Sequence, residues 1–224
     1  MPTRVAWTAP GTPSASAARR RAFYELALHP DAEQRVHEEI SSVLQGRPVQ
    51  AEDLPALDYT RRVVKETLRL HPAPWMLGRR TLVPVRLGTA ELPAGTELAY
   101  CTYAMHRNPA IHPDPLRFDP DRWLPDRAKS LTRCSDLAFG AGVRKCIGDA
   151  LTMNQVLTAV ATIAARWQLR TVPGHRYRPR ARIVISPGPL SMTCHPRDCR
   201  SDESLAFARS VPPAGTRGSE GPAQ

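Results

Sequence analysis

Hydrophobic residues recur with the spacing of an amphipathic helix in three segments of the first third of the chain. The first segment begins near residue 21, the second covers residues 31–44 and the third covers residues 58–70. Asp31 stands where it can cap the second helix, and a Pro-Ala-Pro run closely follows the third. The pattern therefore predicts three helices, and we expect ordered structure to begin near Arg21.

Beyond residue 80 the apolar runs become shorter and are separated by glycine and proline. Residues 107–126 are rich in proline and predict coil, whereas the long apolar stretch 149–167 predicts another helix. Four short runs predict strands: 83–87, 96–101, 177–185 and 190–194. The expected fold class is mainly α with small antiparallel β-sheets, an α+β arrangement.

Both ends of the chain lack a periodic apolar face. Residues 1–20 are rich in Pro, Ser, Thr and Ala, and we expect them to be irregular. Residues 197–224 combine Ser, Gly, Pro and charge, which predicts a disordered tail. With 224 residues in all, residues 21–196 are left to form one domain with a single sizeable core.

Charge and cysteine content narrow the class of protein. A formal net charge of +10 leaves open an acidic protein partner, nucleic acid, an anionic membrane surface or a missing acidic segment. The five cysteines form no Cys-x-x-Cys pair, which argues against a zinc ribbon or a disulfide framework and favours one special thiol. The sequence has neither an apolar run of membrane-spanning length nor a secretory signal pattern, so we expect a cytoplasmic protein without a membrane span.

The most informative segment is F-G-A-G-V-R-K-C-I-G, residues 139–148, directly before the long predicted helix. Its glycines allow a tight turn and a close approach to a flat ligand. The amide donors at the start of the helix are expected to stabilise a thiolate at Cys146. A phosphate-binding loop is the main alternative, but it requires Gly-Lys-Ser/Thr, whereas Lys145 is followed here by Cys146.

This segment resembles the F-x-x-G-x-R-x-C-x-G pattern of the cytochromes P-450, which are haem-thiolate enzymes. The resemblance extends to K-E-T-L-R, with Glu66 and Arg69 three residues apart on one helical face, and to F-D-P-D-R-W, with Arg122. In that family the three side chains form a buried charge network. The order of the parts also matches the carboxy-terminal portion of the family's fold.

The resemblance implies haem b as cofactor, with Cys146 as both the axial ligand of the iron and the catalytic residue. It also implies that Arg144 and, on a weaker match, Arg79 bind the haem propionates. Two apolar segments, 74–77 and 186–190, are expected to line a pocket above the haem, and His106 could reach its edge. The expected cofactor-binding residues are Phe139, Gly140, Arg144, Cys146, Gly148 and Arg79.

The activity that the resemblance implies is insertion of one oxygen atom of O2 into an apolar small molecule. Electrons would come from a ferredoxin-like or flavoprotein donor that docks on the basic face around Arg133, Arg144 and Lys145, and nucleic acid is not expected as a partner. The closest likeness is to bacterial members of the family.

The likeness covers only the carboxy-terminal half of such a protein. Where the family carries its oxygen-activating helix, this chain has A-P-G-T-P-S-A-S, with Pro13 at the acidic position. We expect Pro10 and Pro13 to break a helix there, and the three cations Arg19 to Arg21 to resist burial. A truncated chain that lacks its N-terminal half, or an inactive haem-binding or scaffold remnant, is therefore the alternative interpretation.

Overall fold

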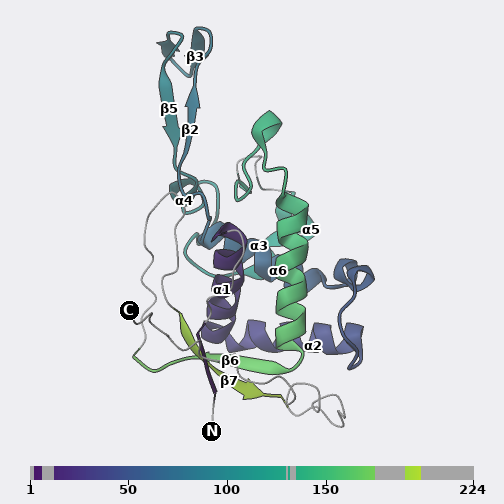
Figure 1. Ribbon diagram of the computed structural model, residues 1–224. Coiled ribbons are helices and arrows are strands. Elements are labelled where there is room, and N and C mark those ends of the chain that lie inside the picture. The colour runs from purple at the N-terminus through teal and green to yellow at the C-terminus, as the bar shows by residue number, and fades with distance from the viewer. Residues whose placement is uncertain (1–2, 7–12, 130, 132–134, 175–189, 198–224) are drawn as a thin grey trace, which may run out of the picture.

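The computed structural model describes residues 3–6, 13–129, 131, 135–174 and 190–197. Its body consists of four helices: α1 (Pro13–Leu28), α2 (Pro30–Leu44), α3 (Asp58–Leu70) and α6 (Asp149–Ala164). Helices α1, α3 and α6 pack against one another, and α2 lies across the base of this group (Figure 1). The expected α+β class is confirmed, because three small antiparallel sheets accompany the helices.

One continuous hydrophobic core holds these helices together. Val36 from α2, Val63 from α3 and Val160 from α6 are each 0% exposed. Complete burial of a side chain of this size contributes about 1.5–3 kcal/mol relative to full exposure. The core extends from Phe23 of α1 to Met192 of the carboxy-terminal sheet. The packing of these faces fixes α3 and α6, the two helices that lead to and from the candidate site.

Helix α1 starts at Pro13, eight residues before the expected start near Arg21. The prediction was wrong because proline is compatible with the first turn of a helix, where its missing N–H has no partner to lose. The expected penalty for Arg21 does not arise either. Arg21 is 1% exposed, but its guanidinium donates to the carbonyl oxygen of His71 at 2.6 Å.

The second and third predicted helices are confirmed, and only the amino-terminal cap of the second differs from expectation. Asp31 lies inside the first turn of α2, where His29 is the N-cap without a side-chain bond, so the predicted cap was wrong. Helix α3 is capped from α2: the Glu39 carboxylate accepts from Tyr59 N at 2.6 Å and from Thr60 N at 2.8 Å. The Thr60 hydroxyl also donates to Glu39. One carboxylate thus satisfies two otherwise unpaired amides at the start of α3 and joins two helices.

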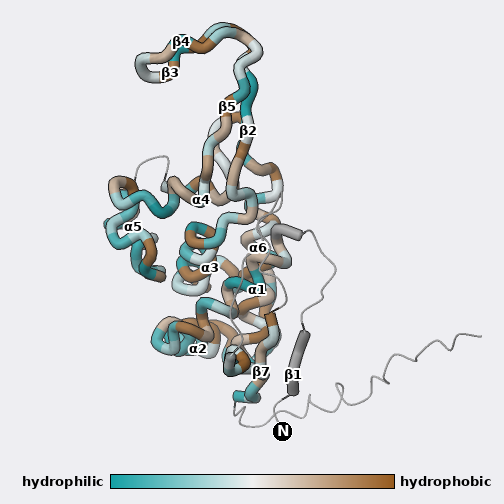
Figure 2. Tube along the Cα trace, turned by 90° about the vertical axis from the view of Figure 1, so that its left-hand side faces the viewer, coloured by the Kyte–Doolittle hydropathy of each residue, from teal (hydrophilic) through white to brown (hydrophobic). Residues whose placement is uncertain are grey.

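Two short antiparallel strand pairs form an arm that extends from the helical body (Figures 1 and 2). Strand β2 (Leu77–Arg80) pairs antiparallel with β5 (Glu97–Tyr100), and β3 (Val85–Leu87) pairs with β4 (Ala90–Leu92). The sequence predicts two strands here, 83–87 and 96–101. The structure instead has two two-stranded sheets, and residues 83 and 84 lie in the connection between them.

A third sheet closes the base of the molecule in the order β1-β7-β6. Its strands are β1 (Thr3–Ala6), β6 (Trp167–Thr171) and β7 (Ser191–Pro196), of which only β7 matches an expected strand. Helix α6 stops at Ala164, and Trp167 opens β6 instead of ending the helix. The expected strand 177–185 falls outside the described residues.

The expected tail is described only at Arg197, and the expected coil is described in full. Arg197, the first residue of the expected tail, donates its N–H to Arg166 O at 2.9 Å and pairs with Glu33, whereas residues 198–224 lie outside the described part. The expected coil at 107–126 is largely confirmed. Short helices interrupt the irregular regions: η1 (Ala51–Ala56), α4 (Thr102–Met105), η2 (Pro120–Trp123), α5 (Pro125–Ala128) and η3 (Gly142–Arg144).

Replacement of the capping carboxylate tests how far α3 depends on α2. We expect Glu39→Ala to lower the free energy of unfolding by about 1–2 kcal/mol, because two backbone amides lose a charged acceptor. Glu38→Ala is the matched control, since the neighbouring side chain is exposed and bonds only to Gln34 among the described contacts. Urea denaturation followed by circular dichroism measures both, and equal effects would contradict the capping role.

Candidate functional site

The loop that carries Cys146 folds back on itself before α6 begins. Leu137 O accepts the N–H of Gly140 at 3.0 Å, and Phe139 O accepts the N–H of Cys146 at 2.8 Å. Gly140 and Gly142 have φ angles of +72° and +68°, a region that side-chain-bearing residues rarely adopt. These two glycines make the turn possible, and the Phe139–Cys146 bond fixes where the thiol emerges.

Cys146 opens into a cavity of about 310 Å³ with mainly apolar walls. Its lining comes from α1, α3, β2, α6, the segment between α3 and β2, and the cysteine loop, which lie far apart in the sequence. The residues are Ala18, Leu68, Ala73, Pro74, Leu77, Arg79, Ala138, Phe139, Gly140, Arg144, Cys146 and Thr152. The structure therefore gathers five of the six expected cofactor-binding residues around one cavity.

Gly148, the sixth, does not line the cavity. A Cβ built on it would lie 3.9 Å from Cys146 Sγ, which is an ordinary contact distance. It serves as the N-cap residue of α6 at φ −95°. Space alone therefore does not require glycine at this position.

The donor set of the cavity fits a flat apolar ligand that carries a metal and carboxylates. One thiol, two guanidinium groups and aliphatic walls meet there. Arg79 is exposed and donates to Gly78 O at 2.8 Å and to the Tyr100 hydroxyl at 3.3 Å, and Arg144 is exposed as well. A guanidinium can bind a carboxylate through two parallel hydrogen bonds. Haem, with one iron and two propionates, matches this combination.

The apolar segments that were expected above the cofactor take different positions. Pro74 and Leu77 line the cavity, whereas Trp75 and Met76 between them do not. Leu190 belongs to the hydrophobic core at 4% exposure, and residues 186–189 lie outside the described part. Only the first of the two segments is thus placed at the cavity.

The carboxylate of Glu66 is the centre of a buried polar network behind the loop. It is 0% exposed and accepts two bonds from Arg69, at 2.8 and 2.9 Å. Trp123 Nε1 donates to it at 3.0 Å, Asp119 N at 3.0 Å and Arg122 Nε at 3.5 Å. The structure brings together the three residues of the expected network and adds Trp123 and Asp119, which the sequence interpretation did not single out.

The two guanidinium groups of the network also organise the coil between the arm and the cysteine loop. Arg69 donates to the carbonyl oxygens of His106 and Pro115 at 2.6 and 2.7 Å. Arg122 donates to those of Pro113 and Asp114 at 2.6 and 3.2 Å. Because this coil has few backbone bonds of its own, the arginines satisfy carbonyl groups that regular structure would otherwise satisfy.

His106 does not line the cavity at Cys146. It is 0% exposed, and its ring bonds to Arg69 O at 3.0 Å and to Leu137 N at 3.0 Å. Burial, opposed only in part by the bond to Arg69 O, lowers the pKa of His106 to about 4. His112 packs edge-on against this ring, and burial together with the positive charge of Arg69 lowers its pKa to about 4 as well.

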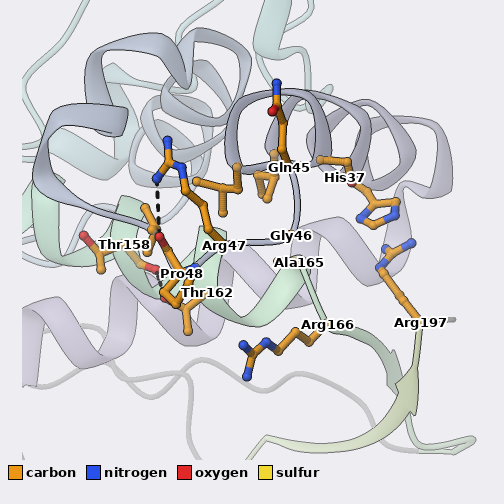
Figure 3. Close-up of a pocket in the computed structure, with 14 residues that line it drawn as sticks. His37, Gln45, Gly46, Arg47, Pro48, Thr158, Thr162, Ala165, Arg166 and Arg197 are labelled. Carbon is orange, nitrogen blue, oxygen red and sulfur yellow. Dashed lines mark hydrogen bonds between the residues drawn. The ribbon is translucent and has the colours of Figure 1, made fainter. Parts of the chain in front are cut away.

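A second cavity, of about 520 Å³, lies between the end of α2 and the end of α6 (Figure 3). Arg47, Arg197 and His37 line it, and Figure 3 shows Arg197 directed toward the His37 ring. Arg47 is engaged by Asp53 at 2.6 and 2.7 Å, and Arg197 pairs with Glu33. This cavity is larger, but its lining contains no cysteine and its ion pairs are internal. The cavity at Cys146 is therefore the better candidate.

Comparison with known proteins decides the family. The family model for cytochrome P-450 matches residues 8–193 of the chain. This chain belongs to the cytochrome P-450 family. Among its relatives is a cyclooctat-9-en-7-ol 5-monooxygenase from Streptomyces melanosporofaciens, 50% identical over 78% of this chain and 38% of that protein. A pentalenene oxygenase from Streptomyces avermitilis is 38% identical over 86% of this chain and 41% of that protein.

Solved structures give the same fold. The crystal structure of a cytochrome P-450 superposes with a TM-score of 0.77 at 23% identity, over 82% of this chain and 42% of that one. The chain thus spans about two fifths of the length of the cytochromes P-450 that it matches. Within the described residues of this family member, no helix is long and apolar enough to cross a membrane.

The network predicts a large effect of neutralising Glu66 in this cytochrome P-450 chain. We expect Glu66→Gln to lower the free energy of unfolding by about 3–5 kcal/mol, because two buried guanidinium groups lose their counter-charge. Glu91→Gln, on the exposed strand β4, should change it by less than about 0.5 kcal/mol. Urea denaturation at pH 7 measures both, and a loss below about 1 kcal/mol in Glu66→Gln would contradict the central role of this carboxylate.

The lowered pKa of His106 predicts that stability falls with acid. Below pH 6.5 the unfolded chain binds a proton that the folded chain does not take up until about pH 4. From pH 7 to pH 5 this histidine should therefore remove about 2 kcal/mol from the free energy of unfolding. In His106→Gln, whose side chain does not titrate, the fall in the free energy of unfolding between pH 7 and pH 5 should be smaller by about that amount. Urea midpoints at pH 7, 6 and 5 test this, and an unchanged pH dependence in the variant would refute it.

Proposed function

We propose that this chain is the haem-binding part of a cytochrome P-450 monooxygenase, with Cys146 as the thiolate ligand of the iron in haem b. The observation that carries the proposal is the convergence of Cys146, Arg79 and Arg144 on one apolar cavity behind which the Glu66 network is buried. The family membership of the chain supports the same assignment.

Each residue has a defined task in this proposal. Haem, when bound, supplies the redox chemistry that activates O2 for insertion of one oxygen atom into the substrate. Cys146 holds the iron through its sulfur, and Arg79 and Arg144 bind and orient the propionates through charged hydrogen bonds. Leu68, Leu77 and the other aliphatic lining residues exclude water from the face of the ring.

The substrate class follows from the cavity and the relatives. The relatives' names specify a cyclic alkenol and an alkene, pentalenene, as the compounds that those proteins oxidise. The walls offered here by Leu68, Ala73, Pro74 and Leu77 are likewise apolar. We infer that the complete enzyme oxidises a small, largely apolar compound.

The outer side of the cysteine loop is suited to an electron donor. Val143 and Ile147 are fully exposed and Leu151 is 64% exposed, beside the charged side chains of Arg144 and Lys145. An apolar centre with a basic rim favours an acidic protein, such as a ferredoxin-like or flavoprotein donor. Arg133, which was expected on this face, lies outside the described residues.

A further polypeptide segment is expected to complete the active site. The chain matches only about two fifths of the length of its relatives. We propose that substrate turnover requires the remaining part of the fold, supplied in the same or in another chain, whereas haem binding depends on the residues present here.

The proposal is tested by the spectrum of the reduced chain with carbon monoxide after expression with haem supplied. We expect a thiolate-type Soret band in the parent chain and its loss in Cys146→Ser. A parent chain that binds haem without this band, or that binds no haem, would overturn the assignment.

The two arginines are tested separately by haem titration. Replacing both Arg79 and Arg144 with Gln should weaken haem affinity at least about tenfold, because the propionates lose two charged partners. Arg86→Gln is the matched control, since Arg86 is an exposed arginine of the arm that does not line the cavity. Equal affinities in the double variant and the parent would refute the propionate role.

A further inference from the structure

His106 joins the buried network to the cysteine loop through both nitrogens of its ring. Nε2 lies 3.0 Å from the backbone nitrogen of Leu137, which can only donate, so Nε2 is the acceptor. Nδ1 lies 3.0 Å from Arg69 O, which can only accept, so Nδ1 carries the proton. Only the neutral ring with the proton on Nδ1 makes both bonds.

The bond to Arg69 is one of a reciprocal pair. The His106 ring donates to the backbone carbonyl of Arg69, while the Arg69 guanidinium donates to the backbone carbonyl of His106 at 2.6 Å. Arg69 is itself held by Glu66. The position of His106 is therefore set from two directions by the end of α3.

Leu137 is connected to Cys146 through the backbone to Phe139 and the hydrogen bond between Phe139 O and the Cys146 amide. Leu137 begins the turn, since its carbonyl accepts the N–H of Gly140, and Phe139 O accepts the N–H of Cys146. Leu137 is 6% exposed and its bond to His106 is buried, so loss of this partner would leave the N–H unsatisfied at a free-energy cost. A shift of this amide would move the backbone that positions Cys146.

We propose that His106 is the positioning residue of the cysteine loop. Its ring is bonded to the end of α3 on one side and to the Leu137 amide on the other, and it thereby holds Cys146 where its sulfur can ligate iron as a thiolate. This inference rests on the proposed role of Cys146. It adds to the Glu66 network a residue whose ring bonds to Arg69 O and Leu137 N and, within the described part of the chain, does not line the cavity.

Two amide substitutions separate the contributions of the two His106 ring bonds, one to Arg69 O and one from Leu137 N–H. The side-chain nitrogen of asparagine lies as many bonds from Cα as Nδ1 does, so His106→Asn keeps a donor for Arg69 O and leaves Leu137 N–H unpaired. The side-chain oxygen of glutamine lies as many bonds from Cα as Nε2 does, so His106→Gln keeps an acceptor for Leu137 N–H. The conservative variant at the loop is thus Gln, and the disruptive one is Asn.

Backbone amide exchange, followed by NMR on the haem-free chain, directly measures how well the His106 ring protects the Leu137 amide. We expect His106→Asn to accelerate exchange at Leu137 and at Cys146 about tenfold or more relative to the parent, while His106→Gln stays within about threefold. His71→Asn is the matched control, because His71 is a largely buried histidine at the end of the same helix that bonds to Glu25 instead of the loop. Equal acceleration in Asn and Gln, or in the His71 control, would overturn the proposal.

The spectrum of the haem-loaded chain is the second measurement. His106→Asn should convert the thiolate-type Soret band of the reduced carbon monoxide complex to a thiol-type band or abolish it, and His106→Gln should retain it. A parent chain without the thiolate-type band counts against the proposed function alone. The exchange data then decide whether His106 positions the loop. The ring 15N shifts of the parent chain provide a check that needs no variant: an Nε2-protonated ring would refute the proposal.

Discussion

The buried carboxylate of Glu66 is the interaction on which the rest of this structure depends. It accepts hydrogen bonds from Arg69, Trp123 and the backbone of Asp119, and a longer one from Arg122. A single anion in a dry interior holds two cations there, because each charge would be costly to bury alone. Once held, the two guanidinium groups bind carbonyl oxygens along a coil that has little regular structure.

This arrangement explains how an irregular segment can fix the position of Cys146. The chain between the arm and α6 contains few elements that could fix it through backbone ladders alone. Its geometry comes instead from side chains of α3 and η2, and from the ring of His106, which connects α3 to the first residue of the cysteine turn. The polar contacts of the Glu66 network and of His106 therefore fix the backbone on one side of the loop. The apolar side chains of the loop face the cavity and the solvent.

Much of the site could be predicted because its chemistry depends on local sequence. The turn at Gly140 and Gly142 needs glycine in the left-handed region, and Cys146 must follow at a fixed spacing for Phe139 O to accept its N–H. The helices over 31–44 and 58–70 could also be predicted, because their apolar residues repeat at helical spacing. The start of α1 could not be predicted in this way, because proline breaks a helix interior but is compatible with the first turn, where Pro13 lies.

The sequence by itself determined the family, the thiol and the three charged residues of the network, because these depend on residue type and spacing along the chain. Only the tertiary structure decided what pairs across long separations: Glu39 with the start of α3, Trp123 with Glu66, and His106 with Leu137. A lone histidine in a proline-rich segment carries no periodic signal. Its role became visible only when packing excluded water and left its two nitrogens facing one donor and one acceptor.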